Sequence, residues 1–131
     1  MDVNIFREYD IRGIYPKTIN EEIAEEIGKS LAQKFKKGRI ILARDARIGS
    51  PSLLEHVTKG LKSVSPHIRF LNIGLSSTPM FYYFVCKEKT EGGIMITASH
   101  NPKEWNGMKV VGKIGHPITG KEILELIHET K

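Results

Sequence analysis

Residues 97–107 hold the side chains best suited to chemistry, because hydroxyl, imidazole, amide and ammonium groups crowd into this short stretch. Ser99 next to His100 suggests a nucleophile with its base. The base must lie within hydrogen-bonding reach of the hydroxyl that it activates, whereas adjacent side chains in an extended loop diverge. The G-x-S-x-G elbow is also absent from the sequence. These residues disfavour a serine hydrolase and leave open a functional loop or a polar turn stiffened by Asn101 and Pro102.

Four motifs follow one another in an order and spacing that match a known family. Ile-Thr-Ala-Ser-His-Asn-Pro at residues 96–102 and Asn-Gly-Met-Lys at residues 106–109 resemble the phosphoserine loop of the α-D-phosphohexomutases. Phe-Arg-Glu-Tyr-Asp-Ile-Arg-Gly at residues 6–13 is similar to the N-terminal signature of the phosphomannomutase/phosphoglucomutase branch. Residues 44–47 and 77–79 match two further segments. Together the motifs extend the resemblance over nearly the whole chain.

The resemblance implies phosphoryl transfer at Ser99. In this family a phosphoserine donates its phosphoryl group to a phosphosugar, and the hexose 1,6-bisphosphate that forms, which also primes the enzyme, returns the other one. Hexose 1-phosphate and hexose 6-phosphate are thereby interconverted. Mg²⁺ is the implied cofactor, bound at Ser99 through its phosphate, with its other ligands on an aspartate-rich loop that this sequence lacks. Since phosphoryl transfer depends on positioning and charge neutralisation, we expect cations around Ser99.

Two basic residues are implied to supply that charge. Lys109 takes the place of a family lysine near the transferring phosphate, where it would stabilise charge or exchange a proton; the alternative is an exposed lysine on an edge strand. Arg12 matches an arginine assigned to proton transfer in the family. Because a guanidinium stays protonated, we interpret Arg12 as a phosphoryl clamp, and its alternative is a surface ion pair with Asp10.

Three further site candidates have open roles. His100 is expected to position the phosphate or to help proton movement, and the alternative is a structural histidine bonded to the loop backbone. Asn101 is either a substrate ligand or a residue that forms the loop. Tyr9 matches a substrate-binding tyrosine, and its alternative is core packing. We interpret Arg47 as one half of a loop ion pair and Thr78 as a helix cap.

The resemblance covers only the first of the four family domains, so residues 1–131 are expected to be domain I, with domains II–IV absent. Lys103 and Trp105 depart from the family pattern, which places proline and tyrosine there. We expect such a chain to be close to inactive alone and to need the remaining mutase domains in cis or in trans. We also expect self-association through an exposed domain seam near the last helix. The alternative function is a non-catalytic module that binds an anionic ligand or a partner protein.

The composition suits an anionic partner, since 20 Lys and Arg against 15 Asp and Glu give a formal net charge of +5. The densest basic cluster, residues 34–39, falls at an expected helix end, where cations complement the helix dipole. We expect no nucleic-acid partner, because no basic-aromatic motif is present, and no membrane partner, because no apolar run approaches ~20 residues. The single cysteine, Cys86, is expected to be a small buried hydrophobe, and a reducing cytoplasm fits this composition.

Strands alternate with helices along most of the chain. Apolar spacing predicts helices over residues 19–35, 50–64, 80–89 and 119–131, and strands over residues 39–43, 68–73, 93–97 and 108–111. The expected helix caps are Thr18 (with Glu21), Ser50, Thr78 and Thr119 (with Glu122). Such alternation predicts an α/β fold: a three-layer α/β/α sandwich with a mostly parallel, mixed sheet of about four strands and a late antiparallel strand at its edge.

Overall fold

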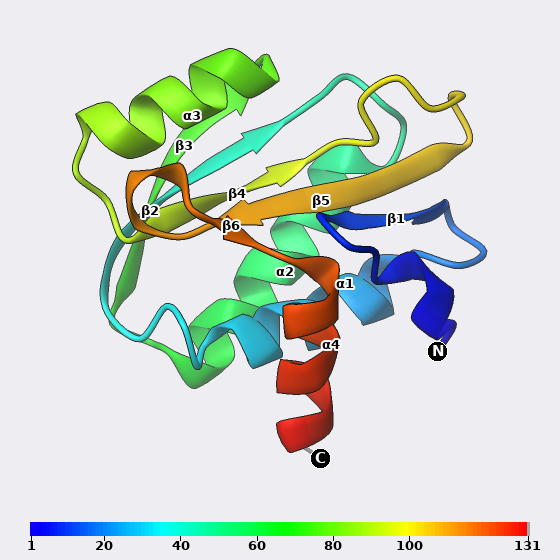
Figure 1. Ribbon diagram of the computed structural model, residues 1–131, viewed down its shortest axis with the longest axis horizontal. Coiled ribbons are helices and arrows are strands. Elements are labelled where there is room, and N and C mark those ends of the chain that lie inside the picture. Colours follow the sequence, from blue (N-terminus) through cyan, green and yellow to red (C-terminus); the bar gives the residue numbers. More distant parts are fainter. Residues whose placement is uncertain (131) are drawn as a thin grey trace.

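A mixed sheet of six strands forms the middle layer of the protein. Figure 1 shows the computed structural model, which describes residues 1–130. The strands are β1 (Ile11–Ile14), β2 (Gly38–Arg44), β3 (Ile68–Leu75), β4 (Gly92–Ile96), β5 (Trp105–Val111) and β6 (Pro117–Ile118). Their order is β1-β5-β4-β2-β3, and β6 also pairs with β5. β2 is parallel to β3 and β4, whereas β5 is antiparallel to β4, β1 and β6. All strands except β5 therefore run in the same direction.

Two strands were not expected from the sequence, β1 and β6. Each is short, and each pairs with β5. β1 pairs with residues 105–108 of β5, and β6 pairs with residues 110–111 of β5. The antiparallel strand is accordingly an inner strand of the sheet, not an edge strand as predicted. The predicted fold class is confirmed, with more strands than expected.

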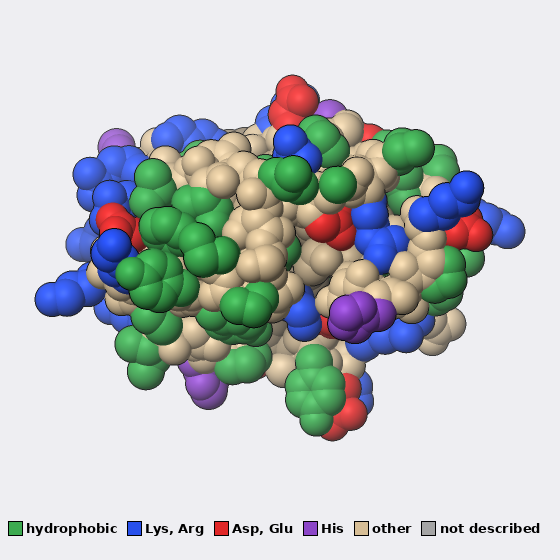
Figure 2. Space-filling view, turned by 90° about the horizontal axis from the view of Figure 1, so that it is seen from above, with side chains coloured by type: hydrophobic (Ala, Val, Ile, Leu, Met, Phe, Trp, Pro, Cys, Tyr) green, Lys and Arg blue, Asp and Glu red, His purple; other side chains and the backbone are tan. Residues whose placement is uncertain are grey.

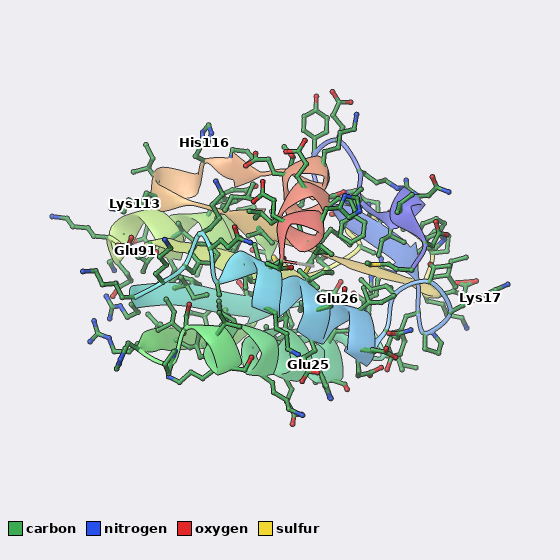
Figure 3. The ribbon with its side chains drawn as sticks, turned by 90° about the horizontal axis from the view of Figure 1, so that it is seen from below. Lys17, Glu25, Glu26, Glu91, Lys113 and His116 are labelled. Atoms are coloured by element: carbon green, nitrogen blue, oxygen red, sulfur yellow. The ribbon has the colours of Figure 1, made fainter. Side chains whose placement is uncertain are left out.

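Helices cover both faces of the sheet (Figures 1 and 3). α1 (Glu21–Leu31), α2 (Ser50–Val64) and α4 (Gly120–Glu129) lie on one face, and α3 (Thr78–Lys87) lies on the other. Single 3₁₀ turns occur at Val3–Ile5 and Lys113–Gly115. Alternate residues of β2 explain the two cores: Ile40 and Leu42 join the larger cluster under α1 and α2, whereas Ile41 and Ala43 join the smaller one under α3. A strand covered on both faces is apolar at every position for this reason.

The helix ends differ from the expected ones by a few residues. The observed N-caps are Asn20 instead of Thr18, Gly49 instead of Ser50, and Ser77 instead of Thr78. The capping box of Thr119 and Glu122 is present as predicted. α1 ends at Leu31, earlier than its apolar stripe suggested. Neighbouring hydroxyl and amide side chains compete for the same role, so the sequence identifies a cap only to within a residue or two.

Two glycines allow α1 and α2 to pack closely. A Cβ added to Gly28 would lie 2.0 Å from the carbonyl oxygen of Val57, and one added to Gly60 would lie 2.0 Å from that of Glu25. Real Cβ atoms do not approach that near. The contact therefore depends on the missing side chains.

α3 covers the sheet with only one side, contrary to the mostly buried helix that was expected. Phe81 and Val85 are its buried residues. Cys86 is exposed, so the prediction that it is buried is wrong. Met80 (48% exposed) and Tyr83 (53%) of α3 are large exposed apolar side chains, and so is Leu75 (63%), the last residue of β3 just before this helix. We call these three residues the α3 apolar face, and Figure 2 shows hydrophobic side chains gathered over this helix.

No helix within residues 1–130 has the length and apolar character needed to cross a membrane.

Candidate functional site

Ser99 lies in the loop of residues 97–104 that connects β4 to β5, at the carboxyl end of a parallel strand. Ligands of open α/β sheets usually bind at this edge. In Figure 3 this end of the sheet is the one near Lys17. The opposite end carries the ion pair of Lys113 with Glu91 (3.6 Å). Ser99 has a φ of 52°, a left-handed conformation that is uncommon outside glycine. Its backbone amide donates to Thr97 Oγ1 at 2.9 Å.

Arg12 reaches this loop from β1. Its pairing with Gly107 across the antiparallel ladder sets it beside the loop. Its Nη2 lies 3.2 Å from Ser99 Oγ, and its Nη1 donates to the carbonyl of Ala98 at 3.0 Å and to Oδ1 of Asn101. The side chain is only 17% exposed. Arg12 does pair with an aspartate, as the alternative interpretation held, but it also contacts the serine hydroxyl.

Asp10 joins the two predicted cations. Its Oδ2 lies 2.8 Å from Arg12 Nη2 and 3.5 Å from Lys109 Nζ, and the residue is 8% exposed. Lys109 is half-buried on the inner strand β5, so it is not the edge-strand lysine of the alternative interpretation. The lysine contacts Asp10 and not Ser99 itself. The arrangement places two cations and one carboxylate beside the serine.

Tyr9 is 71% exposed, which rules out its alternative role in core packing. A shallow hollow beside the serine loop is lined by Arg7, Glu8, Tyr9, Asp10, Arg12 and Lys109. The hollow combines the phenol of Tyr9 with a pair of cations joined by a carboxylate, and Ser99 is not among its lining residues. It is open to solvent and suits a small anionic ligand.

His100 and Asn101 have different surroundings. His100 is exposed, and within residues 1–130 its ring makes no hydrogen bond, so the structure supports neither a Ser99–His100 pair nor the alternative role of a histidine bonded to the loop backbone. Asn101 accepts from Arg12 through its side chain and donates its backbone amide to the carbonyl of Ala98 at 3.0 Å. Those contacts fit the interpretation of Asn101 as a residue that forms the loop.

Arg47 and Thr78 lie where their structural interpretations place them, with one change. Arg47 pairs with Asp45 at 3.1 Å, as a loop ion pair should, and it also donates to the serine loop. Thr78 is the first residue of α3 and not its cap, and its hydroxyl contacts Met95 Sδ at 3.8 Å.

The serine loop itself lines a second hollow. It is lined by Tyr15, Asp45, Ala46, Arg47, Ile48, Ser99, Asn101, Lys103 and Glu104. A hydrogen bond to the Glu21 carboxylate raises the pKa of Tyr15. Burial alone would raise the pKa of Glu21, but hydrogen bonds from Tyr15 and Ser52 lower it below the ordinary value. The bond between Tyr15 and Glu21 ties the loop between β1 and α1 to the first turn of α1.

The residues around Ser99 do not by themselves fit a magnesium site. Asp10 is paired with two cations, and Asp45 accepts from Arg47 and Ser50. Among residues 1–130 no group of three or more His, Cys, Asp or Glu side chains is placed to hold a metal ion. The carboxylates that the chain supplies here neutralise cations and leave no ligand set for Mg²⁺.

Two contributions were missed in the sequence. Asp10 was considered only as a partner of Arg12, and its bridge to Lys109 was not anticipated. A signal exists, because residues two apart in an extended chain project to the same side, which puts Asp10 and Arg12 together. The extent of the Arg47 contacts was also missed, because they depend on the packing of two loops that are far apart in the sequence.

Comparison with known proteins gives consistent results. The family model described as phosphoglucomutase/phosphomannomutase, alpha/beta/alpha domain I, matches residues 3–131. A phosphoglucomutase of Neisseria meningitidis is 43% identical over 127 residues, which are 95% of this chain and 27% of that protein. A phosphomannomutase of Klebsiella pneumoniae is 40% identical over 115 residues, which are 88% of this chain and 72% of that protein.

A crystal structure of a phosphoglucomutase/phosphomannomutase family protein from Burkholderia thailandensis superimposes with a TM-score of 0.85 at 27% identity. The match covers 99% of this chain and 31% of that one. The chain thus spans less than a third of the length of the Neisseria and Burkholderia proteins.

Proposed function

The chain belongs to the phosphoglucomutase/phosphomannomutase family, as its domain I, and on that premise we propose that it carries the phosphoserine of a phosphohexomutase. Ser99 would hold the phosphoryl group. In the forward step the bond between Ser99 Oγ and phosphorus breaks while a hydroxyl oxygen of the hexose monophosphate bonds to phosphorus. The hydroxyl proton leaves to a base, and the product is a hexose 1,6-bisphosphate, which returns its other phosphoryl group to Ser99 after turning over.

The contact of Arg12 Nη2 with Ser99 Oγ carries this proposal. A phosphoserine bears a charge of about −1.5 to −2 at neutral pH, and an arginine already at the hydroxyl would pair with it. Lys109 would add charge from the other end of the Asp10 bridge. The guanidinium stays protonated, so it clamps the phosphoryl group and does not take the proton. His100, exposed next to Ser99, is the proposed proton carrier.

Three parts of the proposal depend on components outside this chain. We propose that the remaining mutase domains, in cis or in trans, supply the rest of the substrate site, and that the chain alone has little activity. Mg²⁺ would bind the Ser99 phosphate, with carboxylates from those domains as further ligands. The reaction would take place in the cytoplasm.

The test is isomerisation of a hexose 1-phosphate, with the remaining domains supplied and a hexose 1,6-bisphosphate as primer. We expect activity that depends on this chain and that Ser99→Ala abolishes. The matched control is Ser63→Ala, a change at an exposed serine in the last turn of α2, which should retain activity. Full activity of Ser99→Ala would overturn the proposal. Binding of the phosphosugar without any turnover would favour a non-catalytic anion-binding module.

A further inference from the structure

Arg47, in the loop between β2 and α2, uses every donor that it has. A guanidinium carries five N–H groups. Nε donates to Asp45 Oδ2 at 3.1 Å. The remaining donors go to main-chain carbonyls of the loop that bears Ser99 and of the first residue of β5. Nη1 donates to Pro102 (2.6 Å) and to Trp105 of β5 (3.2 Å), and Nη2 donates to Ser99 (2.9 Å) and Asn101 (2.6 Å).

The guanidinium is itself held in place by a series of polar groups. Asp45 Oδ1 accepts from the Arg47 backbone amide at 3.1 Å and from Ser50 Oγ at 2.6 Å. Ser50 Oγ accepts from Asn106 Nδ2 at 3.0 Å, and Asn106 is fully buried at the start of β5. A chain of hydrogen bonds therefore runs from the buried end of β5, through the first turn of α2, to Arg47. Each member is fixed by the next one.

The serine loop is consequently held by two arginines with different tasks. Arg12 contacts the side-chain oxygens of Ser99 and Asn101, and its only main-chain partner in the loop is the carbonyl of Ala98. Arg47 contacts only main-chain carbonyls and Asp45, and it has no N–H left for a phosphate. Ser99 meanwhile holds a left-handed backbone, a conformation that persists when the surrounding structure imposes it.

We propose that Arg47 is the positioning residue of the Ser99 loop: its guanidinium fixes the backbone that presents Ser99 Oγ to Arg12, and it does not bind the ligand. The reason why Ser99 must be held so firmly rests on the proposed phosphoryl transfer, but the geometric statement does not. Lysine cannot substitute, because an ammonium offers a point charge with three donors and no planar fork. A lysine at this position could donate to some of these carbonyls, and the others would have no donor.

The experiment compares Arg47→Lys and Arg47→Ala with the wild-type chain by residue-resolved amide hydrogen exchange. The reporters are the amides bonded within or to the loop, those of Ser99, Asn101, Trp105 and Tyr15. Because hydrogen bonds to charged groups are the stronger ones, we expect these amides to exchange about tenfold faster or more in both variants. Amides in α4 should keep their wild-type rates. The matched control is Arg39→Lys, which alters a β2 arginine that pairs with Glu88 away from the loop.

Chemical rescue separates positioning from general stability. Added methylguanidinium should slow exchange of the same amides in Arg47→Ala, because it can occupy the space that the Arg47 guanidinium leaves empty. It should leave exchange in Arg39→Lys unchanged. Unchanged exchange of the loop in Arg47→Ala would overturn the inference, and so would an equal acceleration across α4. Failure of rescue would also count against it. All these outcomes are read without turnover, so they are distinguishable from failure of the mutase assay.

Discussion

At the scale of single residues, Asp10 is the carboxylate that keeps two cations together beside Ser99. Removing its charge in Asp10→Asn leaves Arg12 and Lys109 facing each other without an anion. We expect the free energy of unfolding to fall by about 1–3 kcal/mol. We also expect sulfate to raise the thermal midpoint of this variant more than that of the wild type, because the anion replaces the lost carboxylate.

Thermal unfolding with and without sulfate measures both effects. Glu55→Gln, which removes an exposed carboxylate on α2, is the control and should respond to sulfate as the wild type does. An identical sulfate response in Asp10→Asn and the wild type would show that the two cations do not form an anion site.

The left-handed backbone of Ser99 yields a second prediction at this scale. Ser99→Gly and Ser99→Ala lose the same hydroxyl contact with Arg12, so they differ only at the backbone. Glycine adopts φ near 52° without the clash that alanine suffers, and we expect the glycine variant to be more stable by about 1 kcal/mol. Urea unfolding measures the difference. The same pair at Ser63, in the last turn of α2, should give the reverse order, since alanine favours helix over glycine.

The residues proposed to contact the phosphoryl group could be predicted from the sequence more readily than the residue that positions their loop. Ser99, Arg12 and Lys109 stand in recognisable motifs, and the structure brings Arg12 to Ser99 and Lys109 to Asp10. Arg47 was interpreted as an ordinary loop ion pair, because a residue that bonds carbonyls has no side-chain partner that a sequence pattern could disclose. Roles that depend on main-chain atoms of a distant loop emerge only when the fold is known.

At the scale of elements, the strands covered on both faces were the easiest to anticipate. β2 and β4 are continuous apolar runs, and both were expected within a residue or two. β1 and β6 escaped notice because a strand of a few residues has too short a period to recognise, and its existence depends on its partner β5. α3 was misjudged because its apolar composition was taken as burial, whereas one side of it faces solvent.

The close packing of α1 against α2 gives a prediction for Gly28. In a helix, Gly→Ala ordinarily stabilises by roughly 0.5–1 kcal/mol. Here the new methyl group would overlap the carbonyl of Val57, so the two helices must separate. We expect a net loss of about 1–3 kcal/mol in unfolding free energy, measured by urea denaturation. Lys29→Ala, at the exposed neighbouring position on α1, should be nearly neutral, and a stabilised Gly28→Ala would contradict the close contact.

The bond between Tyr15 and Glu21 predicts a pH-dependent contribution to stability. The pKa of Glu21 is lower in the folded chain than its ordinary value of 4.5. Its contribution is therefore complete above pH 4.5 and is lost as the pH falls through the lower folded value. We expect Tyr15→Phe to lower stability at neutral pH and to converge with the wild type in acid. Urea unfolding across the acid range checks this, with Tyr83→Phe as the control, and a difference independent of pH would refute it.

At the scale of the whole molecule, the α3 apolar face is the surface most exposed to association. Contiguous apolar side chains on a protein surface mark contact sites. The self-association expected through the seam near the last helix stays a prediction, and we propose the α3 apolar face as a further contact surface. Light scattering over a dilution series should show a concentration-dependent mass. Leu75→Ser with Met80→Ser should weaken association, whereas Val64→Ser on the opposite helical layer should not. A constant monomer mass at all concentrations would remove the prediction.

The position of β1 has a consequence for synthesis of the chain on the ribosome. The hydrogen bond from Arg12 to Ser99 joins residues 87 positions apart, and the strand with which β1 pairs is β5. α1 packs on α2, and β2 pairs with β3, from segments translated earlier. The reactive corner, in contrast, stays open until β5 has left the exit tunnel, since contacts between distant segments close last. A chain whose translation stops before β5 would therefore hold much of the core. It would still lack the contact between Arg12 and the Ser99 hydroxyl, so it would have no assembled site.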